Sequence, residues 1–150
     1  MGRSSVKEKD MGWRKIKRAL NHVDGKYVTV GLHEEDAGSG DPNNVEKGYY
    51  NEFGTEHIPA RPFLRSTHDS KKLEWVRQMQ RDFGLVLGNR MTGQAMLESV
   101  GKLAASDVHQ AVIEWDTPPN APSTIRKKGF DDPLVETGEM AEAIDYKVRG

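Results

Sequence analysis

The sequence predicts an α+β fold, in which strands near both ends of the chain form a small antiparallel sheet packed with several α-helices. Three observations predict it. Apolar residues recur at helical spacing over residues 62–83 and again over residues 92–112. β-Branched and aromatic residues gather in KYVTVGLH (26–33) and alternate with polar ones in AIDYKVRG (143–150). The length of 150 residues suits one domain, so we expect residues 1–150 to share a single core.

Residues 1–25 are predicted to form a basic N-terminal helix. Ser5 and Glu8 fit a capping box, in which each side chain satisfies a backbone N–H group at the start of a helix. Residues at helical spacing then form one apolar stripe, which we expect to lie in the core: Trp13, Ile16, Leu20 and Val23. The first 20 residues hold seven lysines and arginines against two acidic residues. The turn signal Asp24-Gly25 should end the helix.

A strand, an acidic loop and a short helix are predicted next. The strand covers about six residues of KYVTVGLH, and HEEDAGSGD (33–41) has the composition of a mobile loop. VEKGYYNEF (45–53) is predicted to be a helix with one apolar side, made of Val45, Tyr49, Tyr50 and Phe53. Gly54 should end this helix in the left-handed conformation that glycine adopts without steric cost.

Two longer helices follow. Pro62 can open the first, because the first turn of a helix does not need its missing N–H group. Its apolar stripe comprises Phe63, Leu64, Leu73, Val76, Met79 and Phe83. Gly84 and Gly88 predict a break or bend, and Thr92 is placed to cap the second helix. The stripe of the second helix comprises Met96, Leu97, Val100, Leu103, Ala104, Val108, Ala111 and Val112.

The C-terminal part begins with a proline-rich connection, residues 114–133. Ser123 is predicted to cap one helical turn within it, and Gly129 to end that turn. Thr137 should cap a short helix, with Glu139 and Glu142 near its positive end. The chain closes with a strand in which Ile144, Tyr146 and Val148 face one way.

The composition and motifs argue against several function classes. The chain has no cysteine, which excludes a disulfide scaffold and a thiolate zinc site. It lacks an H-E-x-x-H pair, a G-x-S-x-G elbow and the lysine of a phosphate-binding loop. No apolar run approaches the length of a membrane span. We therefore expect no enzyme activity, no cofactor, no metal and no membrane association.

The segment NEFGTEHIPARPFLR (51–65) is the most distinctive stretch of the chain. Pro59 and Pro62 hold the residues before them out of the helical region and lower the entropy of the unfolded loop. Phe53 and Phe63 lie at its ends and can pin it to the core. One interpretation is a rigid frame that presents Arg61 and Arg65 to a carboxylate or phosphate partner. The alternative is a helix connection whose arginines satisfy neighbouring carbonyl groups.

These residues also carry a resemblance to a known family. YYNEFGTEHIPARPFLR resembles the E-F-G-T…I-P-A-R-P-F-L-R signature of small tailed-phage proteins called tail-component, virion morphogenesis or tail-completion (head–tail joining) proteins. PNAPSTIRKKGFDDPLVETGEMAEAIDYKV (119–148) resembles the C-terminal pattern of the same family, T-I-x-x-K-G followed by P-L-x-x-T-G-x-M, a short helix and a final strand. KYVTVGLH is similar to the family's early strand. The resemblance covers residues 26–149.

The resemblance implies a structural virion protein without catalysis, of α+β fold. Such a protein is expected at the neck of the particle, where it completes the tail or joins it to the head as a homo-oligomeric ring of six subunits. Its expected partners are the head–tail connector and the tail terminator or tail-tube proteins. By position, the signature loop comprises Glu52, Phe53, Gly54, Thr55, Pro59, Arg61, Pro62, Phe63 and Arg65, and Thr137 and Gly138 would start the last helix.

Within these positions we expect partner contacts from Glu52, Thr55, Arg61 and Arg65, and from the basic cluster Arg126, Lys127 and Lys128. Phe53, Gly54, Pro59, Pro62 and Phe63, with Thr137 and Gly138, are expected to serve the fold. Replacing Arg61 and Arg65 by alanine should then weaken assembly and leave the monomer folded. Basic residues 14–18 or 126–128 could also touch genome DNA in the lumen of the neck.

Two alternatives stay open. One is a different virion part: a tail terminator, a connector adaptor or a minor capsid protein. The other is a DNA-binding regulatory module built on the basic N-terminal helix, although no helix-turn-helix pair is evident in the sequence.

Overall fold

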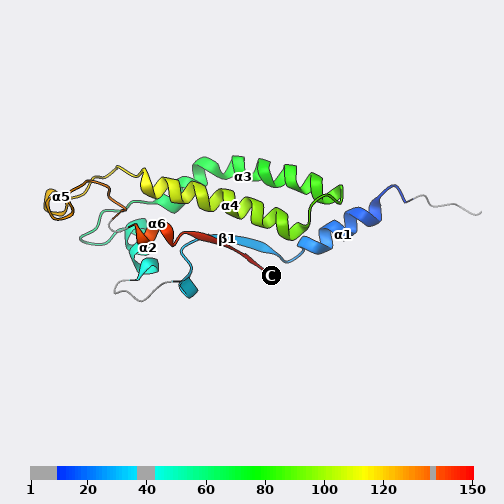
Figure 1. The fold of residues 1–150 in the computed structure, drawn as a ribbon, viewed down its shortest axis with the longest axis horizontal. Coiled ribbons are helices and arrows are strands. Elements are labelled where there is room, and N and C mark those ends of the chain that lie inside the picture. The colour runs from blue at the N-terminus through cyan, green and yellow to red at the C-terminus, as the bar shows by residue number, and fades with distance from the viewer. Residues whose placement is uncertain (1–9, 37–42, 136–137) are drawn as a thin grey trace, which may run out of the picture.

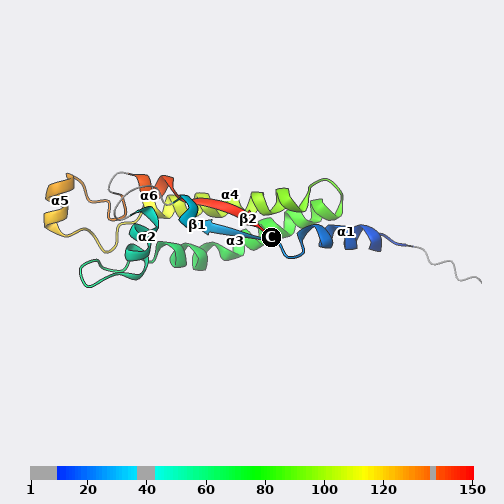
Figure 2. The same cartoon turned by 90° about the horizontal axis from the view of Figure 1, so that it is seen from below.

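The computed structural model describes residues 10–36, 43–135 and 138–150. These residues form six α-helices and one two-stranded antiparallel sheet, which confirms the predicted α+β fold. Helices α3 (Phe63–Leu87) and α4 (Gly93–Ile113) make an antiparallel hairpin along the long axis of an elongated molecule (Figure 1). Helix α1 (Trp13–Val23) lies beside the turn of this hairpin and extends past it, and α5 (Pro122–Lys128) lies at the opposite end of the molecule (Figure 2).

The sheet joins the two ends of the chain, as predicted. Strand β1 (Tyr27–Gly31) pairs with β2 (Asp145–Arg149), with Tyr27 opposite Arg149 and Gly31 opposite Asp145. Helix α4 packs against both strands. The approach is closest at Gly101, where a Cβ atom would lie 2.4 Å from Cδ2 of Tyr146. Only glycine fits at this point of α4 without displacing the side chains of Tyr146 and Val28.

Helix α4 is the central element of the fold. It begins at the predicted cap, where Oγ1 of Thr92 accepts a hydrogen bond from the backbone N–H of Ala95 at 3.1 Å. Most of its predicted stripe is buried, and Val108 and Val112 are among the least exposed side chains. They pack with Phe63 from α3 and with Leu134, Met140, Ala141 and Ile144 from the C-terminal part of the chain.

Helix α3 is longer than predicted and buries a different face. It continues through Gly84, because a single glycine inside a helix is tolerated at modest cost, and it ends at Gly88. Phe63 is fully buried, but Leu73 and Val76 are 66% and 50% exposed. Polar groups contribute to the contact with α4: Nε1 of Trp75 donates to Oδ2 of Asp107 at 2.6 Å. Part of the predicted apolar stripe therefore lies outside the core.

Helix α1 is attached to the body by its C-terminal half. Ala19 is buried and packs with Val86, Met96 and Leu97 at the turn of the hairpin, and Val23 packs beside it. The rest of the predicted stripe is exposed, with Trp13, Ile16 and Leu20 at 58%, 37% and 46%. The prediction that these three side chains lie in the core is wrong, because α1 projects past the elements that would cover them (Figure 1). The predicted capping box at Ser5 lies outside the described residues.

Helix α2 (Asn44–Phe53) has the predicted bounds within one residue, but its buried side is not the aromatic one. Asn43 and Glu46 form a capping box at its start. Gly48 and Glu52 are buried, whereas Tyr49 and Phe53 are 60% and 56% exposed. Gly48 faces the fold, and Leu32 fills the space where a Cβ atom of residue 48 would be. The expectation that Phe53 pins the segment to the core is therefore wrong.

The remaining short elements complete the end of the molecule that carries α5. A single 3-10 turn, η1 (Glu34–Asp36), follows β1. Helix α5 starts at Pro122, so Ser123 does not cap it, and it ends at Gly129 in the left-handed conformation as predicted. Helix α6 (Glu139–Glu142) follows Gly138, which has φ 84°, and the predicted cap Thr137 lies outside the described residues. None of the helices in the described part of the chain is long and apolar enough to cross a membrane.

Candidate functional site

The distinctive segment 51–65 forms the end of α2, a tight loop and the start of α3. Thr55 closes the loop: its backbone N–H donates to the carbonyl of Ile58 at 2.8 Å, and its Oγ1 accepts from the N–H groups of His57 and Ile58. Gly54 has φ 77° and ψ 168°, so its φ is positive as expected but its backbone is not left-handed helical. A Cβ atom there would lie 2.9 Å from the backbone nitrogen of Ala60. Glycine is thus required for both reasons.

Glu52 caps the long helix α3 from the end of α2. Glu52 is 3% exposed, and its carboxylate accepts hydrogen bonds from the backbone N–H groups of Leu64 at 2.9 Å and Arg65 at 3.2 Å. These groups belong to the first turn, where a helix offers unpaired donors and a partial positive charge. The carboxylate also accepts from Nε of Arg65 at 2.8 Å. The role that the structure gives Glu52 is therefore to join two helices rather than to meet a partner.

Arg65 is held by Glu52 but keeps an exposed surface. Its Nη2 donates to the carbonyl oxygen of Glu52 at 2.9 Å, while 58% of its side chain is exposed. The guanidinium lies 5.0 Å from the centre of the Phe53 ring, and that ring lies 4.9 Å from the ring of Tyr49. Tyr49, Phe53 and Arg65 thus form an exposed aromatic–arginine patch. Aromatic residues and arginine are enriched in protein interfaces, so Arg65 keeps its predicted place as a contact candidate.

Arg61 has a structural position. It is 5% exposed, and its guanidinium donates from Nε to the carbonyl of Pro118 at 3.0 Å and from Nη2 to that of Pro119 at 3.3 Å. Nη1 donates to Oδ1 of Asn51 at 3.4 Å. Burial lowers the pKa of Arg61 below its ordinary value, and the carboxylate of Asp131 partly opposes this shift.

Arg61 therefore satisfies neighbouring carbonyl groups, as the second interpretation of the segment proposed. The expectation that Arg61 contacts a partner at the surface is wrong, because its side chain is buried. The side chain ties the signature loop to the proline-rich connection some 57 residues later in the chain. Pro62 and Phe63 keep their predicted structural roles, since Pro62 directly precedes α3 and Phe63 is fully buried. Pro59 lies in the loop and is exposed.

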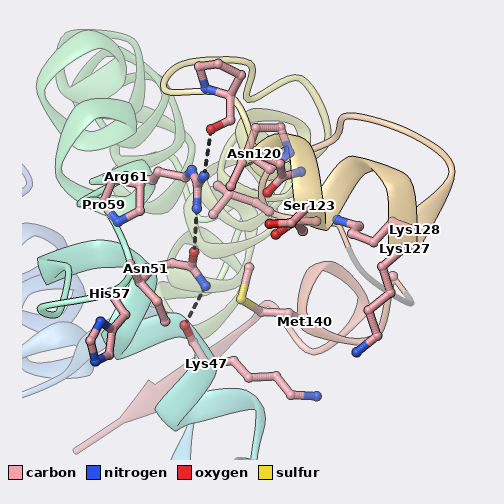
Figure 3. A pocket seen from close by; sticks show the side chains of 17 residues that line it. Lys47, Asn51, His57, Pro59, Arg61, Asn120, Ser123, Lys127, Lys128 and Met140 are labelled. Atoms are coloured by element: carbon pink, nitrogen blue, oxygen red, sulfur yellow. Dashed lines mark hydrogen bonds between the residues drawn. The ribbon is translucent and has the colours of Figure 1, made fainter.

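A pocket of about 650 Å³ opens beside Arg61 (Figure 3). The loop after α2, the segment 119–128 and the residues around α6 surround it. Its described lining includes five basic side chains: Lys47, His57, Arg61, Lys127 and Lys128. Lys47 lies 3.7 Å from the carboxylate of Glu139, and Nδ2 of Asn120 is buried without a hydrogen-bond acceptor among the described atoms.

The basic cluster on α5 divides into two roles. Nζ of Lys128 donates to the carbonyl groups of Asp132 and Val135 and lies 4.9 Å from the centre of the Phe130 ring. Lys128 therefore fixes the loop that follows α5, which was not expected of it. Arg126 and Lys127 are exposed on the last turn of α5 and stay contact candidates.

Three groups that hold the site were missed from the sequence. The backbone carbonyl of Asn51 accepts a hydrogen bond from the backbone N–H of Arg61 at 2.6 Å. The carbonyls of Pro118 and Pro119 accept hydrogen bonds from the guanidinium of Arg61. A Pro-Pro pair offers two carbonyls with few backbone donors nearby, which is the signal that could have suggested an arginine partner. In the described ranges, no cluster of three or more His, Asp or Glu side chains is arranged to hold a metal ion.

Comparison with known proteins found no match. Neither known family models nor curated proteins nor solved structures gave a significant similarity to this chain.

Proposed function

We propose that this protein is a structural virion component of a tailed bacteriophage, which completes the tail or joins it to the head at the neck as a ring of six subunits. The proposal that the protein assembles rests on one observation: many large apolar side chains are exposed to solvent in the single chain. Exposed side chains of this kind among the described residues are Met11, Trp13, Ile16, Leu20, Tyr27, Tyr49, Tyr50, Phe53, Leu73, Val76, Met79, Ile113 and Phe130. Extended apolar surface on a polar protein is typical of a subunit whose surface is covered in an assembly.

The motif supports the neck assignment through the resemblance alone. The role of the motif in the chain agrees with a structural function, because the hydrogen bonds of Glu52 and Arg61 join parts of the same chain. Helices α2 and α3, which this loop connects, then present Tyr49, Phe53 and Arg65 as one patch. A fixed patch loses little conformational entropy on docking, which favours a repeated contact in a symmetric particle.

A second function is favoured by one observation. The four basic residues of α1, Arg14, Lys15, Lys17 and Arg18, are all exposed. A basic helix face of this kind suits contact with DNA, either genome DNA in a neck or the target of a regulatory module. A salt-dependent gel shift with duplex DNA tests this role. No retardation at low salt would remove the DNA contact and leave the neck proposal in place.

The place of the protein in a particle is tested by antibody labelling of purified virions. A label at the junction of head and tail is the expected result. A label at the tail tip, along the tube or over the capsid would replace the proposal by another virion part. Particles that carry no copy of the chain would leave the regulatory module as the better reading.

A further inference from the structure

Helix α1 has an exposed apolar face, and the body of the same chain has an apolar groove that no described residue fills. The groove has a volume of about 710 Å³. Its floor is the surface of α4 at Val100, Ala104 and Val108, one wall is β1 at Val28 and Val30, and the other wall is α3 from Leu64 to Met79. Charged residues at its edge are Arg65, Asp69 and Lys72.

The groove exists because α4 supports two separate neighbours. Helix α3 packs on one side of α4 and the sheet packs on another, while α3 and β1 make few contacts with each other. The space between them leaves Val76 50% exposed and Met79 36% exposed. Apolar walls and floor of this kind favour an apolar occupant.

We infer that the occupant is helix α1 of a second copy of this chain. The exposed residues Trp13, Ile16 and Leu20 occur at i, i+3 and i+7, which is the spacing of anchors on a helix that lies in a groove. The dimensions agree, since the 11 residues of α1 span about 16 Å and the α3 wall from residue 64 to residue 79 spans about 22 Å. The basic side chains Arg14 and Arg18 lie on the opposite side of α1 and stay in solvent.

The occupant comes from another copy because α1 is fixed away from the groove of its own chain. Ala19 is 5% exposed and packs with Val86, Met96 and Leu97 at the hairpin turn. In both views α1 points away from the body, along the long axis (Figures 1 and 2). Its exposed residues therefore meet a neighbour's groove without breaking the contacts of Ala19.

This contact joins two different surfaces, α1 on one subunit and the groove on the next. Contacts between unlike surfaces repeat head to tail and close into a ring when the rotation between subunits permits. The inference rests on the self-assembly in the proposed function and names the surfaces that produce it.

The absence of cysteine makes a direct test possible. One preparation carries Ile16→Cys and a second carries Val76→Cys, and the two are mixed and treated with a short bismaleimide. The expected result is a crosslinked dimer that appears only in the mixture. The matched control replaces Ile16→Cys by Arg14→Cys, on the opposite face of α1, and should give at least tenfold less product. Equal product from both pairs, or none from either, would overturn the inference.

Protection of the groove identifies the occupant. If Val76→Cys resists maleimide in the assembled protein but does not crosslink to Ile16→Cys, another segment or partner fills the groove and α1 is excluded. If Val76→Cys reacts fully in an assembled ring, the groove is empty and the inference fails, while the neck proposal stands. Ile16→Glu should weaken self-association at least tenfold, and Asn21→Glu, on the solvent side of α1, should not. Circular dichroism of each variant checks that it is folded.

Discussion

Replacing Glu52 should destabilise the fold more than replacing any other charged residue of the signature loop. Glu52→Ala leaves the N–H groups of Leu64 and Arg65 without their acceptor and removes the negative charge from the start of a 25-residue helix. Loss of a helix cap costs about 0.5–2 kcal/mol, and loss of a hydrogen bond to a charged group about 1.5–3 kcal/mol. Because these contributions overlap, we expect a total loss of about 2–4 kcal/mol in the free energy of unfolding.

Two comparison variants separate the helix cap from the ion pair. Glu52→Gln keeps an acceptor oxygen and loses the charge, so it should cost about 1–2 kcal/mol. Arg65→Ala keeps the cap and removes the ion pair, together with the Nη2 hydrogen bond to the carbonyl of Glu52 and the contact with the Phe53 ring. Because the Arg65 side chain is 58% exposed, we expect a cost of about 1 kcal/mol or less.

Urea unfolding followed by circular dichroism measures all three variants, at a concentration where the chain is monomeric. With a slope of about 2 kcal/mol per molar urea, Glu52→Ala should lower the midpoint by about 1–2 M. A midpoint within 0.2 M of the unmodified protein would refute the capping role. A larger loss from Arg65→Ala than from Glu52→Ala would show that the ion pair, and not the cap, holds the two helices together.

Three further predictions concern the loop contacts, the sheet and the ion pairs of the strands. Arg61→Ala should lower the free energy of unfolding by about 2–3 kcal/mol, because the carbonyls of Pro118 and Pro119 lose their donor. An unchanged midpoint of urea unfolding in this variant would contradict the role of Arg61 in holding the loop to residues 118 and 119. Gly101→Ala should destabilise by about 1–3 kcal/mol because its methyl group meets Tyr146, whereas Gly84→Ala, where nothing lies within 4 Å, should be neutral or stabilising in thermal unfolding. The backbone hydrogen bond at Glu35 and hydrogen bonds from Arg149 and Lys147 lower the pKa of Glu35 to about 2. A lowered pKa means that this stabilisation is present above the ordinary value of 4.5 and is lost as the pH falls toward 2. An NMR titration should show this pKa rising toward its ordinary value in the double variant Lys147→Met, Arg149→Met, and an unchanged pKa would show that the strand cations do not cause the shift.

Much of the fold could be predicted because local signals and tertiary packing agree. The strands at both ends, the cap at Thr92 and the end of α5 at Gly129 follow from alternation and from residues with specific backbone preferences. The burial of α4 follows from its stripe, since a helix that is packed on two sides must be apolar on both.

The errors arise where apolar spacing does not decide which surface is covered. The stripes of α1 and α3 and the aromatic side of α2 have the spacing of a core face, yet Trp13, Val76 and Phe53 are exposed in the single chain. Periodicity predicts that a face is apolar, and it does not say whether the same chain or another one covers it.

The sequence predicted which segment forms the loop, but it did not predict the contacts that Glu52 and Arg61 make there. The segment 51–65 was singled out because proline, glycine, arginine and aromatic residues occur together, and it does form a rigid loop. The roles of Glu52 and Arg61 depend on acceptors and donors that are brought close only by folding: the first turn of α3 and the carbonyls of residues 118 and 119. Sequence spacing carries no information on such long-range hydrogen bonds.

Electron microscopy of lysates from a phage in which this reading frame carries a stop codon tests the proposed function most directly. The account predicts filled heads and finished tails that are separate, and it predicts that adding the purified protein restores joined particles. Complete and infectious particles without the protein would contradict it. Tails of uncontrolled length, or heads without any tails, would contradict the joining role and assign the protein to tail termination or tail assembly.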